Sequence, residues 1–346
     1  MDTKLSPRLG IVILLAAATA FATNHLGARI AFDHGASVAA AVTTRATCTA
    51  LVLLLLMRLQ GISLAIPRAL RGKALLAGIL IATQSYCLYS AVALIPPALA
   101  LLVFQTSPML YVLLTWVLGK EAPRWSLLAP MLLALAGLAL ALNLRTDQLA
   151  AQWAEIGAGV SWAFASGASM TIVYYLNANA LKPLDGRLRT FAMTAVAAVL
   201  VAAGGAAADA LELPGDATGW LGLALLTVFY CVAMTSLFFI LPRVPAASTA
   251  ALNFEPIALL GLAWIFLGHS VTPLQLLGAV LTVVALFYYL VVARQMYIEA
   301  PVRAGRIQVE PTLAVSVILC VLGVVVFGIY PKPIVMAALR VAAPLF

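Results

Sequence analysis

The chain has 346 residues, of which 64% are hydrophobic and only 9% are charged, and its formal net charge is +8. A soluble domain carries about 25% charged residues, so this composition excludes an ordinary water-soluble protein. The mean hydropathy of +1.08 is typical of a protein whose solvent is lipid. The basic charge forms no compact binding face, so we expect no nucleic-acid partner.

Runs of about 20 apolar residues recur along the chain, each long enough to cross about 30 Å of hydrocarbon as an α-helix. We predict an all-α fold, a polytopic helix bundle surrounded by membrane lipid. In chain order the eleven predicted spans are 9–31, 36–57, 73–94, 97–118, 124–144, 154–177, 190–208, 218–240, 245–268, 273–293 and 312–330. Short connections between them leave no room for a separate soluble domain.

The distribution of basic residues predicts the orientation of these spans. With the N-terminus in the cytoplasm, fifteen Lys and Arg residues fall on the cytoplasmic side and three fall outside, namely Arg145, Lys332 and Arg340. This bias follows the positive-inside rule. We therefore predict an integral protein of a bacterial inner (plasma) membrane, with its N-terminus in the cytoplasm and its C-terminus outside.

Two segments, 95–142 and 244–289, are weak copies of each other. A single offset of 148 residues superposes Pro97 on Pro245, Pro108 on Pro256 and Trp116 on Trp264. Five spans per half is an odd number, so the second copy enters the membrane from the opposite side. The sequence thus predicts two inverted repeats related by a pseudo-two-fold axis in the membrane plane.

The repeat divides the chain into three predicted parts. Residues 9–144 form a first five-helix repeat, and residues 151–293 form a second. Residues 294–346 form a cytoplasmic linker and an extra C-terminal transmembrane helix. The predicted bundle therefore has ten transmembrane helices plus an appended eleventh.

Three stretches carry a resemblance to a known family. IPPALALLVFQTSP…WVLGKE, VPAASTAALNFEP…WIFLGH and the early FATNHLGARIAF…TTRATCTALVLLLL are similar to the EamA type of the drug/metabolite transporter superfamily. The resemblance covers about residues 9–293. It implies ten helices and the export or exchange of small metabolites such as amino acids. The family tends to have an acid after the second Leu-Gly, where this chain has His269.

Residues 294–346 have a different resemblance. They are similar to the C-terminal helix of antiporter-like subunits of the respiratory NADH:quinone oxidoreductase, without those subunits' proton-conducting lysines and glutamates. We interpret this segment as an eleventh helix with no transport chemistry of its own.

Arg45 and Glu255 are charged residues well inside predicted spans, where a charge at the bilayer centre costs about 2.5–3.5 kcal/mol. Glu255 precedes Pro256, and it is a candidate to bind substrate and to bind and release a proton, or to serve as a structural acid. Arg45 is a candidate to hold a substrate carboxylate with two hydrogen bonds, or to pair with Glu255. Because proline removes a backbone donor, Pro108 and Pro256 are candidate hinges.

Further candidates are polar or aromatic side chains inside the spans. They are expected to line a cavity between the repeats, or else to be satisfied by helix–helix hydrogen bonds and packing. They are Asn24, His25, Gln84, Tyr86, Gln105, Trp162, Tyr230 and Asn253. No His or Cys residues lie at metal-ligand spacing, so we expect neither a metal site nor a cofactor.

The sequence therefore predicts a secondary transporter for small amphipathic metabolites, working by alternating access, with coupling to protons left open. A non-transporting subunit of a larger membrane complex is the alternative. No HExxH, GxSxG or Walker A motif is present, so we expect no enzyme activity. A monomer and a homodimer are both compatible with the sequence.

Overall fold

The computed structural model describes residues 7–118, 125–141, 149–240, 252, 254–267, 272–281 and 284–285. Throughout this part of the chain the regular structure is helical, without a strand. In chain order the elements are α1 (Pro7–Asp33), α2 (Val38–Leu59), α3 (Arg68–Leu94), α4 (Pro97–Phe104), α5 (Ser107–Val117), α6 (Trp125–Ala141), α7 (Leu149–Tyr175), the π-helical turn η1 (Leu176–Ala180), α8 (Gly186–Ala207), α9 (Ala217–Ile240) and α10 (Glu255–Leu267).

Seven helical segments in the described residues are long and apolar enough to cross a membrane, so the protein is an integral membrane protein. Residues 273–281 form a further helical segment. The last predicted span, 312–330, and His269 lie outside the described residues, as does the whole segment 294–346.

The fourth predicted span, 97–118, is present as the apolar segment Pro97–Val117, but it is not one continuous helix. α4 ends at Phe104 and α5 begins at Ser107. The break follows from Pro108, which has no N–H to donate to the carbonyl of Phe104 four residues earlier. Thr106 closes the end of α4, because its hydroxyl donates to the Val103 carbonyl at 2.8 Å.

A second helix begins at the equivalent place. α10 starts at Glu255, directly before Pro256, although the ninth span was predicted to begin at residue 245. Residues 241–251 lie outside the described part. Ser107 and Glu255 are 148 residues apart, which is the offset of the sequence repeat, and the same offset carries the bounds of α2 onto those of α8.

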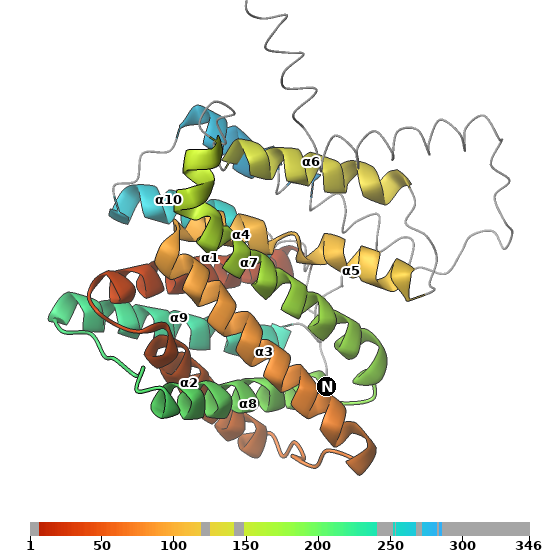
Figure 1. Cartoon of the computed structure of the whole chain (residues 1–346). Helices are drawn as coiled ribbons and strands as arrows, with labels where there is room; N and C mark the ends of the chain where they lie inside the picture. Colours follow the sequence, from red (N-terminus) through yellow and green to blue (C-terminus); the bar gives the residue numbers. More distant parts are fainter. Residues whose placement is uncertain are drawn as a thin grey trace, which may run out of the picture.

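The helices of the two halves pack against each other in pairs. α1 lies along α9, α3 along α7 and α2 along α8, while α3 also contacts α8 and α2 contacts α9 (Figure 1). α10 packs on α1 and α4, and α7 packs on α4 and α5. Each of these contacts joins an early segment to a late one, so the core is formed between the halves.

Small residues let α1 and α9 approach at backbone distance. A Cβ atom added to Gly27 would lie 2.6 Å from the Leu226 nitrogen, and one added to Gly222 would lie 2.6 Å from the Ala31 nitrogen. α3 and α7 meet differently, through the hydroxyls of Ser166 and Ser169, which donate to α3 carbonyls at 2.9 Å. Both devices are common where helices associate in lipid.

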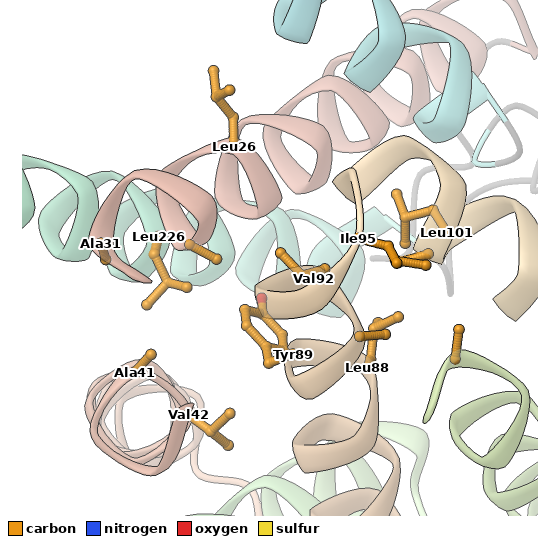
Figure 2. Close-up of a cluster of buried hydrophobic side chains, with 14 of the residues drawn as sticks. Leu26, Ala31, Ala41, Val42, Leu88, Tyr89, Val92, Ile95, Leu101 and Leu226 are labelled. Carbon is orange, nitrogen blue, oxygen red and sulfur yellow. The ribbon is translucent and has the colours of Figure 1, made fainter. Parts of the chain in front are cut away.

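The main core cluster draws on α1, α2, α3, α4 and α9, with single or paired residues from α7, α8 and α10. The Tyr89 ring projects from α3 into this cluster, with Val42 of α2 and Leu226 of α9 nearby (Figure 2). Tyr89 is the largest of the fully buried side chains.

We predict that Gly27→Ala lowers the melting temperature of the detergent-solubilised protein. The added methyl group would meet backbone atoms of α9, which cannot move without shifting the helix. The expected loss is about 1–3 kcal/mol, as for other overpacked sites. Gly72→Ala is the matched control, since no atom lies within 4 Å of its added Cβ. Equal melting temperatures for the two variants, measured by size-exclusion chromatography after heating, would contradict the close α1–α9 contact.

Candidate functional site

Six side chains from five helices meet in the interior of the bundle, and we call them the polar cluster. They are Asn24 and His25 of α1, Arg45 of α2, Tyr89 of α3, Tyr230 of α9 and Glu255 of α10. Five of the six were candidates from the sequence, and the structure brings those five together.

A close contact between an imidazole and a carboxyl group joins α1 to α10. The Nε2 atom of His25 lies 3.2 Å from Oε1 of Glu255, and the two side chains are 6% and 22% exposed. Glu255 occupies the first turn of α10, where the helix dipole favours a negative charge. The other ring nitrogen of His25 has no hydrogen-bond partner among the described residues.

Arg45 is held between two aromatic faces. Its guanidinium carbon lies 4.4 Å from the centre of the Tyr89 ring and 3.9 Å from the centre of the Tyr230 ring. A desolvated cation–π contact contributes about 2 kcal/mol. Arg45 is 3% exposed, and it forms no ion pair with any described residue, because Glu255 pairs with His25 instead.

Asn24 fixes the Tyr89 ring over Arg45. The Asn24 amide donates to the Tyr89 hydroxyl at 2.8 Å, and the Tyr89 hydroxyl donates to the Asn24 side-chain oxygen. Tyr230 is supported in turn by Phe21, whose ring meets it edge-on with centroids 5.9 Å apart. Both rings are therefore positioned by α1.

The remaining candidates lie outside the polar cluster. Gln84 donates to the Ser166 hydroxyl of α7 at 3.2 Å and belongs to the α3–α7 contact. Gln105 caps the end of α4 at the helix break. Its proposed mate Asn253 lies outside the described residues, so the pairing of these two amides stays a prediction.

Tyr86 and Trp162 are each 40% exposed and do not join the polar cluster. Tyr86 shares the outer face of α3 with Ile79 and Thr83, which are also exposed. A role for Tyr86 or Trp162 in binding substrate stays a prediction.

Tyr89 is the member of the cluster that the sequence reasoning missed. The buried face of α3 runs at helical spacing through Gly78, Ala82, Ser85, Tyr89 and Val92. The three small or polar positions before Tyr89 predict a face in close contact with other helices. A tyrosine on that face needs a hydrogen-bond partner for its hydroxyl, so the spacing of these residues could have identified Tyr89 as a candidate.

The polar cluster combines one guanidinium, one carboxyl, one imidazole, one amide and two phenol groups. Among the described residues no group of three or more His, Cys, Asp or Glu side chains gathers as metal ligands do. The arrangement is suited to ion pairing, stacking and directed hydrogen bonds with a small polar molecule.

Comparison with known proteins agrees with this architecture. The model of the EamA-like transporter family matches residues 8–143 and, a second time, residues 157–291. A crystal structure of a protein superposes with a TM-score of 0.58 and 19% sequence identity, covering 85% of this chain and 100% of that chain. At this identity the likeness shows a shared fold alone.

A curated protein matches a shorter stretch. The chain is 34% identical over 74 residues to NADH-quinone oxidoreductase subunit N of Moorella thermoacetica. The match covers 21% of this chain and 16% of that subunit, so the chain spans only a small part of that relative.

Tyr89→Phe is expected to destabilise the protein, because it leaves the buried Asn24 amide without its tyrosine partner. An unsatisfied buried polar group costs about 1–3 kcal/mol. Tyr86→Phe, on the exposed face of the same helix, is the control and should melt like the wild type. If both variants melt alike in detergent, the Asn24–Tyr89 hydrogen bonds do not support the bundle.

Proposed function

Because the chain belongs to the EamA-like transporter family, we propose that it is a secondary transporter that exports or exchanges small metabolites across the inner membrane. The observation that carries the proposal is the position of the polar cluster. Asn24, His25, Arg45 and Tyr89 belong to the first segment matched by the family model, and Tyr230 and Glu255 belong to the second. A site shared by two halves can be opened to one side and then to the other.

The packing of the helices supports two inverted repeats. An offset of 148 residues relates α1 to α7, α2 to α8, α3 to α9 and α5 to α10. Under this exchange the α1–α9 contact becomes the α7–α3 contact, and the α2–α9 contact becomes the α8–α3 contact, and all four occur. Such reciprocity is what a pseudo-two-fold axis produces, and five spans per half would place that axis in the membrane plane. The proposal keeps ten spans and, from the distribution of basic residues, a cytoplasmic N-terminus.

The chemistry of the polar cluster supports a substrate with polar and apolar parts, such as an amino acid or a related compound. Charged groups of both signs lie beside two aromatic rings, and they are enclosed by the apolar core cluster. In hydrocarbon, polar groups of this kind mark substrate and ion pathways.

Alternating access requires contacts that form and break between the halves. The His25–Glu255 pair joins α1 to α10, and α10 starts at a proline-marked helix end. Protonation of Glu255 would remove the negative charge that attracts His25 and would weaken this link. We therefore include proton coupling through Glu255 in the proposal. Pro108 and Pro256 are proposed as the hinges about which the helices move during the transport cycle.

A second candidate function rests on the similarity to subunit N of NADH-quinone oxidoreductase. In that case the chain would be a non-transporting member of a larger membrane complex. Purification in mild detergent separates the two functions, because a carrier moves solute alone whereas a subunit is isolated with its partners.

The proposed function is tested by uptake into proteoliposomes of a labelled pool of common amino acids, with and without an imposed pH gradient. We expect saturable uptake that the gradient accelerates several-fold in the wild type, and no acceleration in Glu255→Gln. Glu212→Gln is the control, since Glu212 is an exposed acid outside the spans.

The outcomes separate the parts of the proposal. If the pH gradient has no effect on uptake by the wild type, Glu255→Gln and Glu212→Gln, proton coupling is overturned, while the assignment as a carrier stands. Absence of uptake of any amino acid by well-folded protein would overturn the amino-acid carrier itself.

A further inference from the structure

We propose that Arg45 binds the carboxylate group of the transported solute along the edge of its guanidinium, and that Tyr89 and Tyr230 set the plane in which it does so. The inference rests on the proposed function and narrows it to one substrate class, small solutes with a free carboxylate. It assigns Tyr89 and Tyr230 as positioning residues rather than as the walls of an apolar pocket.

The charge of Arg45 lacks a counter-charge in the described part of the protein. Arg45 is 3% exposed, and its Nε atom has no hydrogen-bond partner among the described residues. Burying a charge costs several kcal/mol unless it is paired. Glu255, the nearest acid in the polar cluster, is engaged by His25 at 3.2 Å. An anionic ligand would supply the missing counter-charge and a hydrogen-bond acceptor for Arg45.

The geometry restricts how an anion can reach the guanidinium. Two rings lie against it, since the guanidinium carbon is over the Tyr89 ring, 4.4 Å from its centre, and over the Tyr230 ring, 3.9 Å from its centre. The N–H donors of arginine lie in the plane of the group, so acceptors must approach along the edge. A carboxylate is planar and has two oxygens that match two parallel N–H groups. This in-plane approach favours a carboxylate ligand.

The two rings are held in place independently of Arg45. Tyr89 is fixed by hydrogen bonds with Asn24, and Tyr230 by the edge of Phe21 at 5.9 Å. The two rings are thus in place beside the guanidinium before a ligand arrives. Lysine could supply the positive charge at this position, but its ammonium group lacks the planar pair of N–H donors.

The test is a competition assay on the reconstituted full-length protein. Labelled amino acids are taken up in the presence of unlabelled amino acids, of their α-carboxamides, or of the amines that remain after loss of the carboxylate. In the wild type we expect the carboxamides and amines to compete at least about 10-fold more weakly, the factor that 1.4 kcal/mol produces. This comparison needs no variant, so it stands even if a substitution prevents folding.

Variants then assign the preference to Arg45. In Arg45→Gln the preference for the carboxylate should fall to within about 2-fold, and Arg45→Lys should restore it only partly. Tyr230→Leu removes the ring face over which Arg45 lies and should weaken carboxylate competition by about 10-fold. Arg58→Lys, at the exposed end of the same helix, is the control.

Equal competition by carboxylates and carboxamides in the wild type would overturn the inference and leave the carrier intact. Retention of the full preference in Arg45→Gln would overturn it as well, because another group would then bind the carboxylate. Failure of all uptake contradicts the proposed function and is distinguishable from both results.

Discussion

Hydrocarbon offers no hydrogen-bond partner to a polar side chain, and the arrangement of this bundle depends on that constraint. Asn24, His25 and Arg45 lie on the first two helices, where lipid would leave them unsatisfied at a cost of several kcal/mol. Their contacts come from α3, α9 and α10. Satisfying these groups requires that α1 lie between α3 and the late helices, and the close Gly27–Gly222 approach makes this position available. The core and the candidate site therefore have the same origin.

Much of this architecture could be predicted from the sequence, for physical reasons that also explain the failures. Apolar length predicts spans well, and the cost of a buried charge singled out Arg45 and Glu255. The partners of these charges could not be predicted, since periodicity does not say which helices meet. Glu255 was therefore only one possible partner of Arg45 from the sequence, whereas the structure places the guanidinium over two aromatic rings. The break after Phe104 was missed because the high hydropathy of the whole run 97–118 outweighed the local signal, three polar residues (105–107) directly before Pro108.

The two halves use different chemistry at contacts that the repeat relates. α1 and α9 touch through glycine and backbone atoms, whereas α3 and α7 are joined by serine hydroxyls that donate to carbonyl oxygens. The first kind of contact tolerates no added atom, and the second depends on directed hydrogen bonds. Glu255 has Ser107 as its repeat mate, so the carboxyl group likewise occurs in one copy of the repeat and not in the other. The two halves therefore share the arrangement of their helices, whereas the side chains that form the contacts differ between them.

Because early helices pair with late ones, the first helices must wait during synthesis until their packing partners have been made. His25 and Glu255 are separated by 230 positions in the chain. At a synthesis rate of about 5–20 residues per second, α10 leaves the ribosome roughly 10–50 s after α1. For that interval α1 and α2 carry Asn24, His25 and Arg45 in the membrane without their final partners. The strongly apolar remainder of each helix must hold it there until the second half has been made.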